Sequence, residues 1–138
     1  MKSLVWLRND LRMDDNPALK HACLNSDEVH CLYLYQPDQM KLHNVASCKI
    51  EFIIENLKDL ESSLSKINVP LTVITSKCFD DCPNLIIDVI NKRSIKKVYW
   101  NNQFGFDEQR SDSAVKDVLD RNNIYSESFD DQVIYPPG

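Results

Sequence analysis

Short apolar runs rich in β-branched and aromatic residues alternate along this chain with stretches whose apolar residues recur every three or four positions. The first pattern is typical of buried strands, and the second is typical of amphipathic helices. Strands joined by helices run parallel in one sheet, and such a sheet needs helices on both faces. We therefore expect an α/β fold with a doubly wound, five-stranded parallel Rossmann-like sheet and helices on both faces. The expected strands are Lys2–Leu7, Val29–Tyr35, Leu71–Thr75, Lys97–Trp100 and Ile124–Phe129.

Helices are expected between these strands. Asn16 and Pro17 predict the start of the first one, because an asparagine side chain caps free N–H groups and proline fits the first helical position. The expected helices are Pro17–Leu24, Ala46–Ile67, a helix that begins near Asp80, Asp81 and Pro83, and Asp107–Arg121. An apolar stripe runs along the longest of them. It comprises Ile50, Ile53, Ile54, Leu57, Leu60, Leu64 and Ile67.

A ligand of such a sheet is expected beyond the carboxyl ends of the strands. The loops Arg8–Asp15, Gln36–Val45 and Asn101–Phe106 should meet there. The chain has two glycines, Gly105 and Gly138, so it contains neither a G-x-G-x-x-G dinucleotide loop nor a Walker A loop. Any nucleotide-like ligand would therefore be held by other means.

Charge, cysteine content and motifs argue against several other functions. The net charge of −5 disfavours DNA binding by this chain alone. The five cysteines form no C-x-x-C pair, and Cys78 and Cys82 make a poor zinc site, so no metal is expected. The sequence has no run near the roughly 20 apolar residues of a membrane span and no signal peptide, which predicts a cytoplasmic protein. No catalytic residues are expected, because G-x-S-x-G and H-E-x-x-H motifs are absent.

The most specific pattern of the chain lies in the segment Trp6–Leu19, which places two arginines and three aspartates in one loop after the first strand. Here the sequence resembles the photolyase/cryptochrome family, whose N-terminal domain opens with W-x-R-x-D-L-R-x-x-D-N-x-A-L. Every fixed position of that pattern is met. The matching residues are Trp6, Arg8, Asp10, Leu11, Arg12, Asp15, Asn16, Ala18 and Leu19.

Two further stretches support this resemblance. Trp100–Phe104, followed by Asp107 and Glu108, is similar to the family's fourth strand and to the start of its last helix. Phe129–Gly138 is similar to the segment that leads into the family's interdomain linker. The resemblance therefore covers essentially the entire chain, but only the first domain of the family.

The resemblance implies a light-harvesting function. In the family this domain holds an antenna chromophore, which passes excitation energy to a reduced FAD in a second, helical domain. The implied protein is a deoxyribodipyrimidine photolyase, which uses light to repair pyrimidine dimers in DNA. Residues 1–131 would form the antenna domain, and residues 132–138 would start the linker. The helical FAD domain, which would be the partner in the same chain or in trans, is absent from this sequence; catalysis and DNA binding would belong to it.

The implied chromophore is methenyltetrahydrofolate, with deazaflavin or flavin as alternatives. In folate-binding members an Asn–Glu pair at the start of the last helix contacts the pterin, and Asp107 and Glu108 occupy those positions. Glu108 matches, whereas an ionised Asp107 cannot donate the hydrogen bond of an asparagine amide. The family also has a histidine at the place of His43. Together with Arg8 of the opening motif, these are the expected cofactor-binding residues.

Each of these residues also has a structural explanation. Asp107 can cap its helix and Glu108 can interact with the helix dipole. His43 can face solvent, and Arg8, Asp10 and Arg12 can form a salt-bridge cluster that stiffens the loop. The alternative functions are a chromophore-free remnant or interaction module, a cryptochrome-type photoreceptor domain, and a subunit similar to electron-transfer flavoproteins. A domain face left uncovered would expose apolar surface and favour a homodimer.

Overall fold

The structure is a computed structural model of the chain, and it describes residues 2–7, 16–35, 47–75, 82–102 and 106–129. In residues 47–50, 82 and 106–111 it describes the backbone alone. The elements in chain order are β1 Lys2–Leu7, α1 Pro17–Asn25, β2 Glu28–Tyr35, α3 Ser47–Ser65, β3 Leu71–Thr75, α4 Cys82–Arg93, β4 Lys97–Asn101, α5 Phe106–Arg121 and β5 Tyr125–Phe129. The expected order of strands and helices is confirmed.

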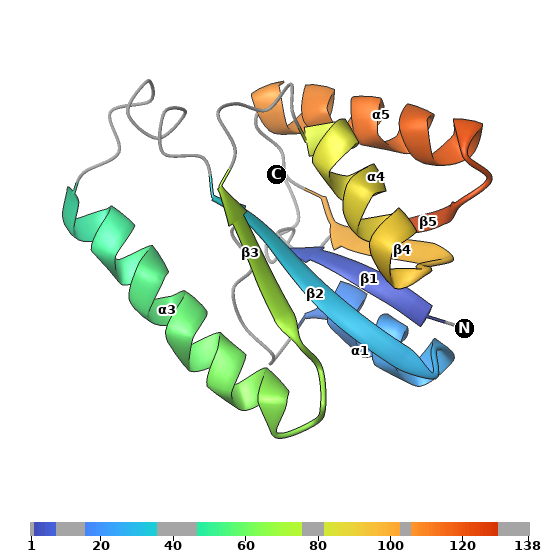
Figure 1. Cartoon of the computed structure of the whole chain (residues 1–138). Helices are drawn as coiled ribbons and strands as arrows, with labels where there is room; N and C mark the ends of the chain where they lie inside the picture. Colours follow the sequence, from blue (N-terminus) through green and yellow to red (C-terminus); the bar gives the residue numbers. More distant parts are fainter. Residues whose placement is uncertain (1, 8–15, 36–46, 76–81, 103–105, 130–138) are drawn as a thin grey trace, which may run out of the picture.

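The five strands form one parallel sheet in the order β3-β2-β1-β4-β5. Successive residues of a strand point to opposite faces of a sheet. Along β1, Leu4 and Trp6 therefore join a core cluster with α4 and α5, whereas Val5 and Leu7 join a second cluster with α1 and α3. Figure 1 shows the twisted sheet with α4 and α5 on one side of it. The doubly wound α/β fold with helices on both faces is confirmed.

The longest helix differs from its prediction in where it ends and in how much of its apolar stripe is buried, whereas its expected start at Ala46 lies outside the described residues. α3 ends at Ser65, before the expected end at Ile67, whose side chain is 47% exposed. Leu60 and Leu64 are buried against the sheet, as the apolar stripe predicts, but Ile54 is 39% exposed. In Figure 1, α3 diverges from the edge strand β3 towards its own N-terminal end. The apolar stripe is therefore covered by the sheet mainly in its C-terminal half.

Three helices end in the same type of turn, although none of the turns contains glycine. The residue at the left-handed position is Asn68 after α3, Ser94 after α4 and Asn123 after α5, with φ of 61°, 56° and 59°. The N–H group of the next residue bonds back across the turn. These bonds are Val69 to Leu64 O, Ile95 to Ile90 O and Ile124 to Leu119 O, at 3.0, 3.0 and 2.9 Å. This Schellman arrangement returns a branched apolar side chain to the core at each helix end.

Replacing Ser94 with glycine should raise the free energy of unfolding by about 1 kcal/mol, because glycine adopts positive φ without a clash of its side chain. Ser62→Gly is the matched control, since Ser62 is exposed within α3. It should lower the free energy of unfolding by about 0.5 kcal/mol. Urea denaturation followed by circular dichroism measures both changes. A loss of stability in Ser94→Gly would contradict this account of the turn.

Candidate functional site

The connections of the sheet diverge between β1 and β4. The chain leaves β1 for α1 on one face and leaves β4 for α5 on the other face. β1 and β4 are neighbours in the sheet, with Trp6 opposite Trp100. The helices that follow these two neighbouring strands therefore lie on opposite faces of the sheet. Open α/β sheets bind ligands at such a switch point, beside the carboxyl ends of the strands. This carboxyl edge is the candidate functional site.

Two buried asparagines link the strands at this edge. Asn101, the last residue of β4, is 1% exposed, and Asn16, just before α1, is 3% exposed. The Asn101 Nδ2 donates to Asn16 Oδ1 at 2.8 Å, and the Asn101 Oδ1 accepts from the N–H of Ala18 at 3.1 Å. The sequence predicted Asn16 as a helix cap, and this is confirmed by its bond from the N–H of Leu19 at 3.2 Å. It did not predict Asn101 as the partner.

These bonds occupy the start of α1. Pro17 has no N–H, and the N–H groups of Ala18 and Leu19 bond to the two asparagine side chains. The N–H of Lys20 bonds to the main-chain oxygen of Asn16 at 3.0 Å. Free N–H groups at a helix start are the groups that bind phosphate in many nucleotide sites. Here they bond within the protein, so α1 does not provide a phosphate site at this switch point.

A pair of tryptophans lies beneath the same edge on the α4 and α5 side. Trp6 and Trp100 are 2% and 3% exposed and pack edge to face, with ring centroids 6.0 Å apart. The indole N–H of Trp100 is buried and has no hydrogen-bond acceptor among the described residues. A buried donor without an acceptor costs free energy. This N–H group belongs to the second-last residue of β4, and it is enclosed within the core.

The end of β5 is fixed beside the end of β4. Phe129 stacks on His21 of α1 with ring centroids 4.5 Å apart, and lies nearly parallel to Tyr99 at 6.4 Å. The N–H of Asn102 donates to the main-chain oxygen of Phe129 at 2.7 Å. These contacts join α1, β4 and β5, so the point at which the chain leaves the sheet is fixed relative to the carboxyl edge.

The residues expected to bind a cofactor fall into two groups. Asp107 and Glu108 lie in the first turn of α5, which follows β4, but only their backbone is described. α5 begins at Phe106, so Asp107 lies inside the first turn rather than at the capping position expected of it. Arg8 and His43 lie outside the described residues. The contribution of all four to ligand binding stays a prediction.

A second polar cluster lies near the amino edge of the sheet. His30 on β2 is 7% exposed; Arg93 Nη1 lies 3.2 Å from its Nδ1 and Glu28 Oε1 lies 3.4 Å from its Nε2. Because a guanidinium only donates, Nδ1 accepts and the ring proton of the neutral imidazole is on Nε2. Arg93 also donates to Thr72 Oγ1 at 3.3 Å. Burial lowers the pKa of His30, the charge of Arg93 lowers it further, and Glu28 opposes both. These groups bond to one another, which indicates a structural function.

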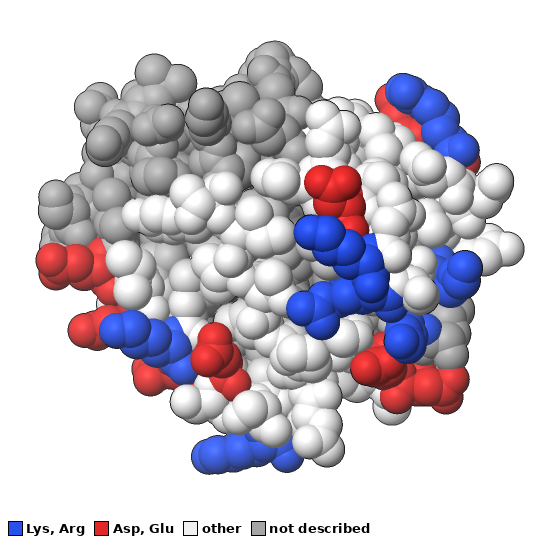
Figure 2. Space-filling model, viewed as in Figure 1, with Lys and Arg blue, Asp and Glu red and all other residues white. Residues whose placement is uncertain are grey.

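Charged side chains on the face shown in Figure 2 are mixed in sign. Basic side chains gather over the end of α4, whose last turn holds Lys92 and Arg93, and acidic side chains lie around them. A DNA-binding face carries a broad basic surface, and the described part of this face carries none. Within the described ranges, no three His, Cys, Asp or Glu residues are grouped as metal ligands. None of the helices, as far as the structure describes them, is long and apolar enough to cross a membrane.

Comparison with known proteins gives consistent matches over the chain. The sequence model of the family described as DNA photolyase matches residues 3–138. The deoxyribodipyrimidine photo-lyase of Escherichia coli (strain K12) is 35% identical over 136 residues, which cover 98% of this chain and 28% of that protein. Cryptochrome-1 of Rattus norvegicus is 35% identical over 117 residues, which cover 84% of this chain and 19% of that protein. The chain thus spans less than a third of the length of these relatives.

A solved structure shows the same fold. The photolyase from the archaeon Sulfolobus tokodaii, described with two FAD molecules and a novel light-harvesting cofactor, superposes with a TM-score of 0.81. The alignment covers 99% of this chain and 31% of that one at 22% identity. At this identity the likeness supports the fold alone, and it agrees with the doubly wound sheet described above.

Replacing Asn101 with alanine should lower the free energy of unfolding by about 2–4 kcal/mol, because the buried N–H of Ala18 loses its acceptor and Asn16 Oδ1 loses one of its donors. Asn25 is the matched control, since its amide donates to the main-chain oxygen of His21 at 2.9 Å in an exposed setting. Asn25→Ala should cost less than about 0.5 kcal/mol. Urea denaturation compares the two variants, and equal costs would show that the buried pair does not stabilise the fold.

Stability should also depend on the protonation of His30. Its pKa is lowered in the folded state, so between that pKa and the unfolded value near 6.5 the unfolded chain binds more protons. The free energy of unfolding should therefore fall as pH drops from about 7 to 5, and His30→Gln should flatten this dependence. His21→Gln controls for the loss of one histidine. An unchanged pH dependence in His30→Gln would refute the assignment.

Proposed function

The chain belongs to the DNA photolyase family, and from this membership we propose that it is the light-harvesting α/β domain of a deoxyribodipyrimidine photolyase. It would bind an antenna chromophore at the carboxyl edge of the sheet and thereby support light-driven repair of pyrimidine dimers in DNA. When bound, the chromophore would supply the absorption of light and the transfer of excitation energy. The partner would be the helical FAD domain of such photolyases, to which we assign DNA binding and the repair reaction.

The family match over residues 3–138 carries this proposal. The two curated relatives described above are equally identical to the chain, but the photo-lyase match covers 98% of it and the cryptochrome match covers 84%. This difference favours the photolyase over a cryptochrome-type photoreceptor domain, which is the second candidate. The flavoprotein-like alternative has no comparable support.

The described part of the carboxyl edge fits a ligand that is recognised by its ring system rather than by phosphates on α1. The N–H groups at the start of α1 are bonded to Asn16 and Asn101. A pterin ring has N–H donors and a carbonyl acceptor, so both acceptor and donor side chains of the protein can bind it.

Within this proposal, methenyltetrahydrofolate is the first candidate ligand, and Glu108 accepts hydrogen bonds from the N–H groups of the pterin. Asp107 stands where folate-binding members have asparagine, and its carboxylate lacks the amide donor. Arg8 and His43 are proposed as further contacts. The missing donor at Asp107 leaves deazaflavin and flavin as the alternative ligands, and a chromophore-free interaction module as the alternative function.

Titration of the purified chain with methenyltetrahydrofolate, followed by absorption and fluorescence, tests the proposal. We expect saturable binding that Glu108→Ala weakens about tenfold or more, because a charged acceptor is lost. Asp107→Asn should tighten binding about fivefold, because it restores one donor. Flavin and deazaflavin serve as comparator ligands.

Asp117→Ala is the matched control, since Asp117 is an exposed acid farther along the same helix. It should leave the affinity unchanged. If none of the three ligands binds, the chain is better explained as a chromophore-free module. If folate binds equally well to the Glu108→Ala variant, the assignment of Glu108 is wrong.

A further inference from the structure

An apolar groove lies between α3 and the edge strand β3, apart from the polar carboxyl edge formed by Asn16 and Asn101. It arises because α3 diverges from the sheet, which leaves Ile54 of α3 39% exposed and Val73 of β3 45% exposed. The groove has a volume of about 320 Å³. Its lining residues are Tyr35, Ile54, Leu57, Lys58, Glu61 and Val73.

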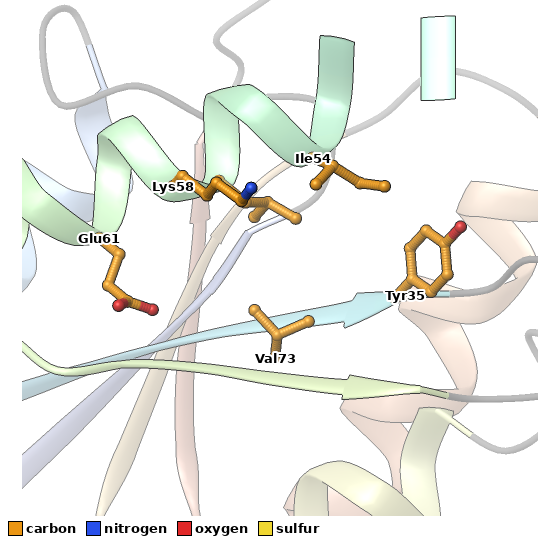
Figure 3. Close-up of a pocket in the computed structure, with 6 residues that line it drawn as sticks. Tyr35, Ile54, Lys58, Glu61 and Val73 are labelled. Atoms are coloured by element: carbon orange, nitrogen blue, oxygen red, sulfur yellow. The ribbon is translucent and has the colours of Figure 1, made fainter. Parts of the chain in front are cut away.

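Figure 3 shows how these side chains are arranged. Val73 points from β3 towards α3, and Ile54, Lys58 and Glu61 follow one another along the facing side of the helix. Tyr35 stands at one end of the groove. In Figure 2 the surface along β3 is mostly uncharged. The groove is thus an apolar strip with one basic and one acidic side chain on its helical wall.

The groove lies next to an open edge of the sheet. Among the described residues, β3 pairs with β2 on one side and with no strand on the other. The main-chain groups on the outer side of such a strand can pair with another strand. An apolar groove beside an edge strand favours an occupant that covers the groove and the outer side of the strand together.

The charges on the groove indicate which occupant fits. Lys58 and Glu61 lie three residues apart on one side of α3, and both are exposed. If two α3 helices run antiparallel about a twofold axis midway between these residues, Lys58 of each copy faces Glu61 of the other. A twofold axis requires a surface that is complementary to itself, and this pair of opposite charges meets that requirement.

We propose that this groove is a self-association surface, which a second copy of the chain occupies across a twofold axis close to Val73. The two Val73 side chains and the two Ile54 side chains close the groove, and the two β3 strands lie side by side in antiparallel directions. The reciprocal Lys58–Glu61 contacts at the rim set the register. The inference does not depend on chromophore binding.

Sedimentation velocity of the 138-residue chain tests this proposal over a range of protein concentrations. The expected result is a reversible dimer. Lys58→Glu should raise its dissociation constant about tenfold or more, because two attractive contacts become repulsive. Glu61→Lys should act in the same way, and the double variant with both changes should restore the dissociation constant to within about threefold. Val73→Lys should abolish the dimer.

Lys116→Glu is the matched control, because Lys116 is exposed on α5 and undergoes the same change of charge as Lys58. It should leave the dissociation constant unchanged, and circular dichroism checks that each variant is folded. A wild-type chain that stays monomeric at about 100 μM overturns the proposal, since a specific interface of ordinary size associates more tightly than this. A dimer that Lys58→Glu leaves intact, or that the double variant does not restore, overturns it as well.

Discussion

The hydrogen bond between Asn16 and Asn101 is the contact on which the rest of this structure depends. It joins the start of α1 to the end of β4 at the point where the connections of the sheet separate to opposite faces. Both amides are buried, so their hydrogen bonds with water must be replaced within the protein. The same two side chains accept from the N–H groups of Ala18 and Leu19. One network therefore holds the first helix, the centre of the sheet and the switch point together.

This network also excludes one common way of binding a ligand, which uses free N–H groups at the start of the first helix. In many nucleotide-binding folds a glycine-rich turn and free helix N–H groups hold phosphates, but here the helix start is bonded to asparagines and the chain has two glycines. Under the proposed function, recognition at the carboxyl edge is instead assigned to side chains such as that of Glu108, which lies in the first turn of α5. Near the amino edge of the sheet, Arg93 bonds to His30 and to Thr72, so these polar groups are satisfied within the protein.

The sequence predicted the strands and helices well, because their periodicities are local properties. It predicted Asn16 as a cap for the same reason. It did not predict the partner Asn101, since the two residues lie 85 positions apart and no local pattern links them. The stripe along α3 included Ile54, but a stripe does not reveal how far the sheet extends beneath it. The expected capping by Asp107 was wrong in position, because α5 begins at Phe106. The contacts of Arg8 and His43 lie outside the described residues.

The central claim is that the carboxyl edge of the sheet binds an antenna chromophore. The most direct measurement is a series of ¹H–¹⁵N correlation spectra of the labelled chain during titration with methenyltetrahydrofolate. The account predicts that shift changes gather at the amides of Asn101, Asn102 and the first turn of α5, while those of Ile95 and Lys96 at the amino edge stay constant. Changes centred on the amino edge or on the groove beside Val73, or no changes at saturating ligand, would contradict it.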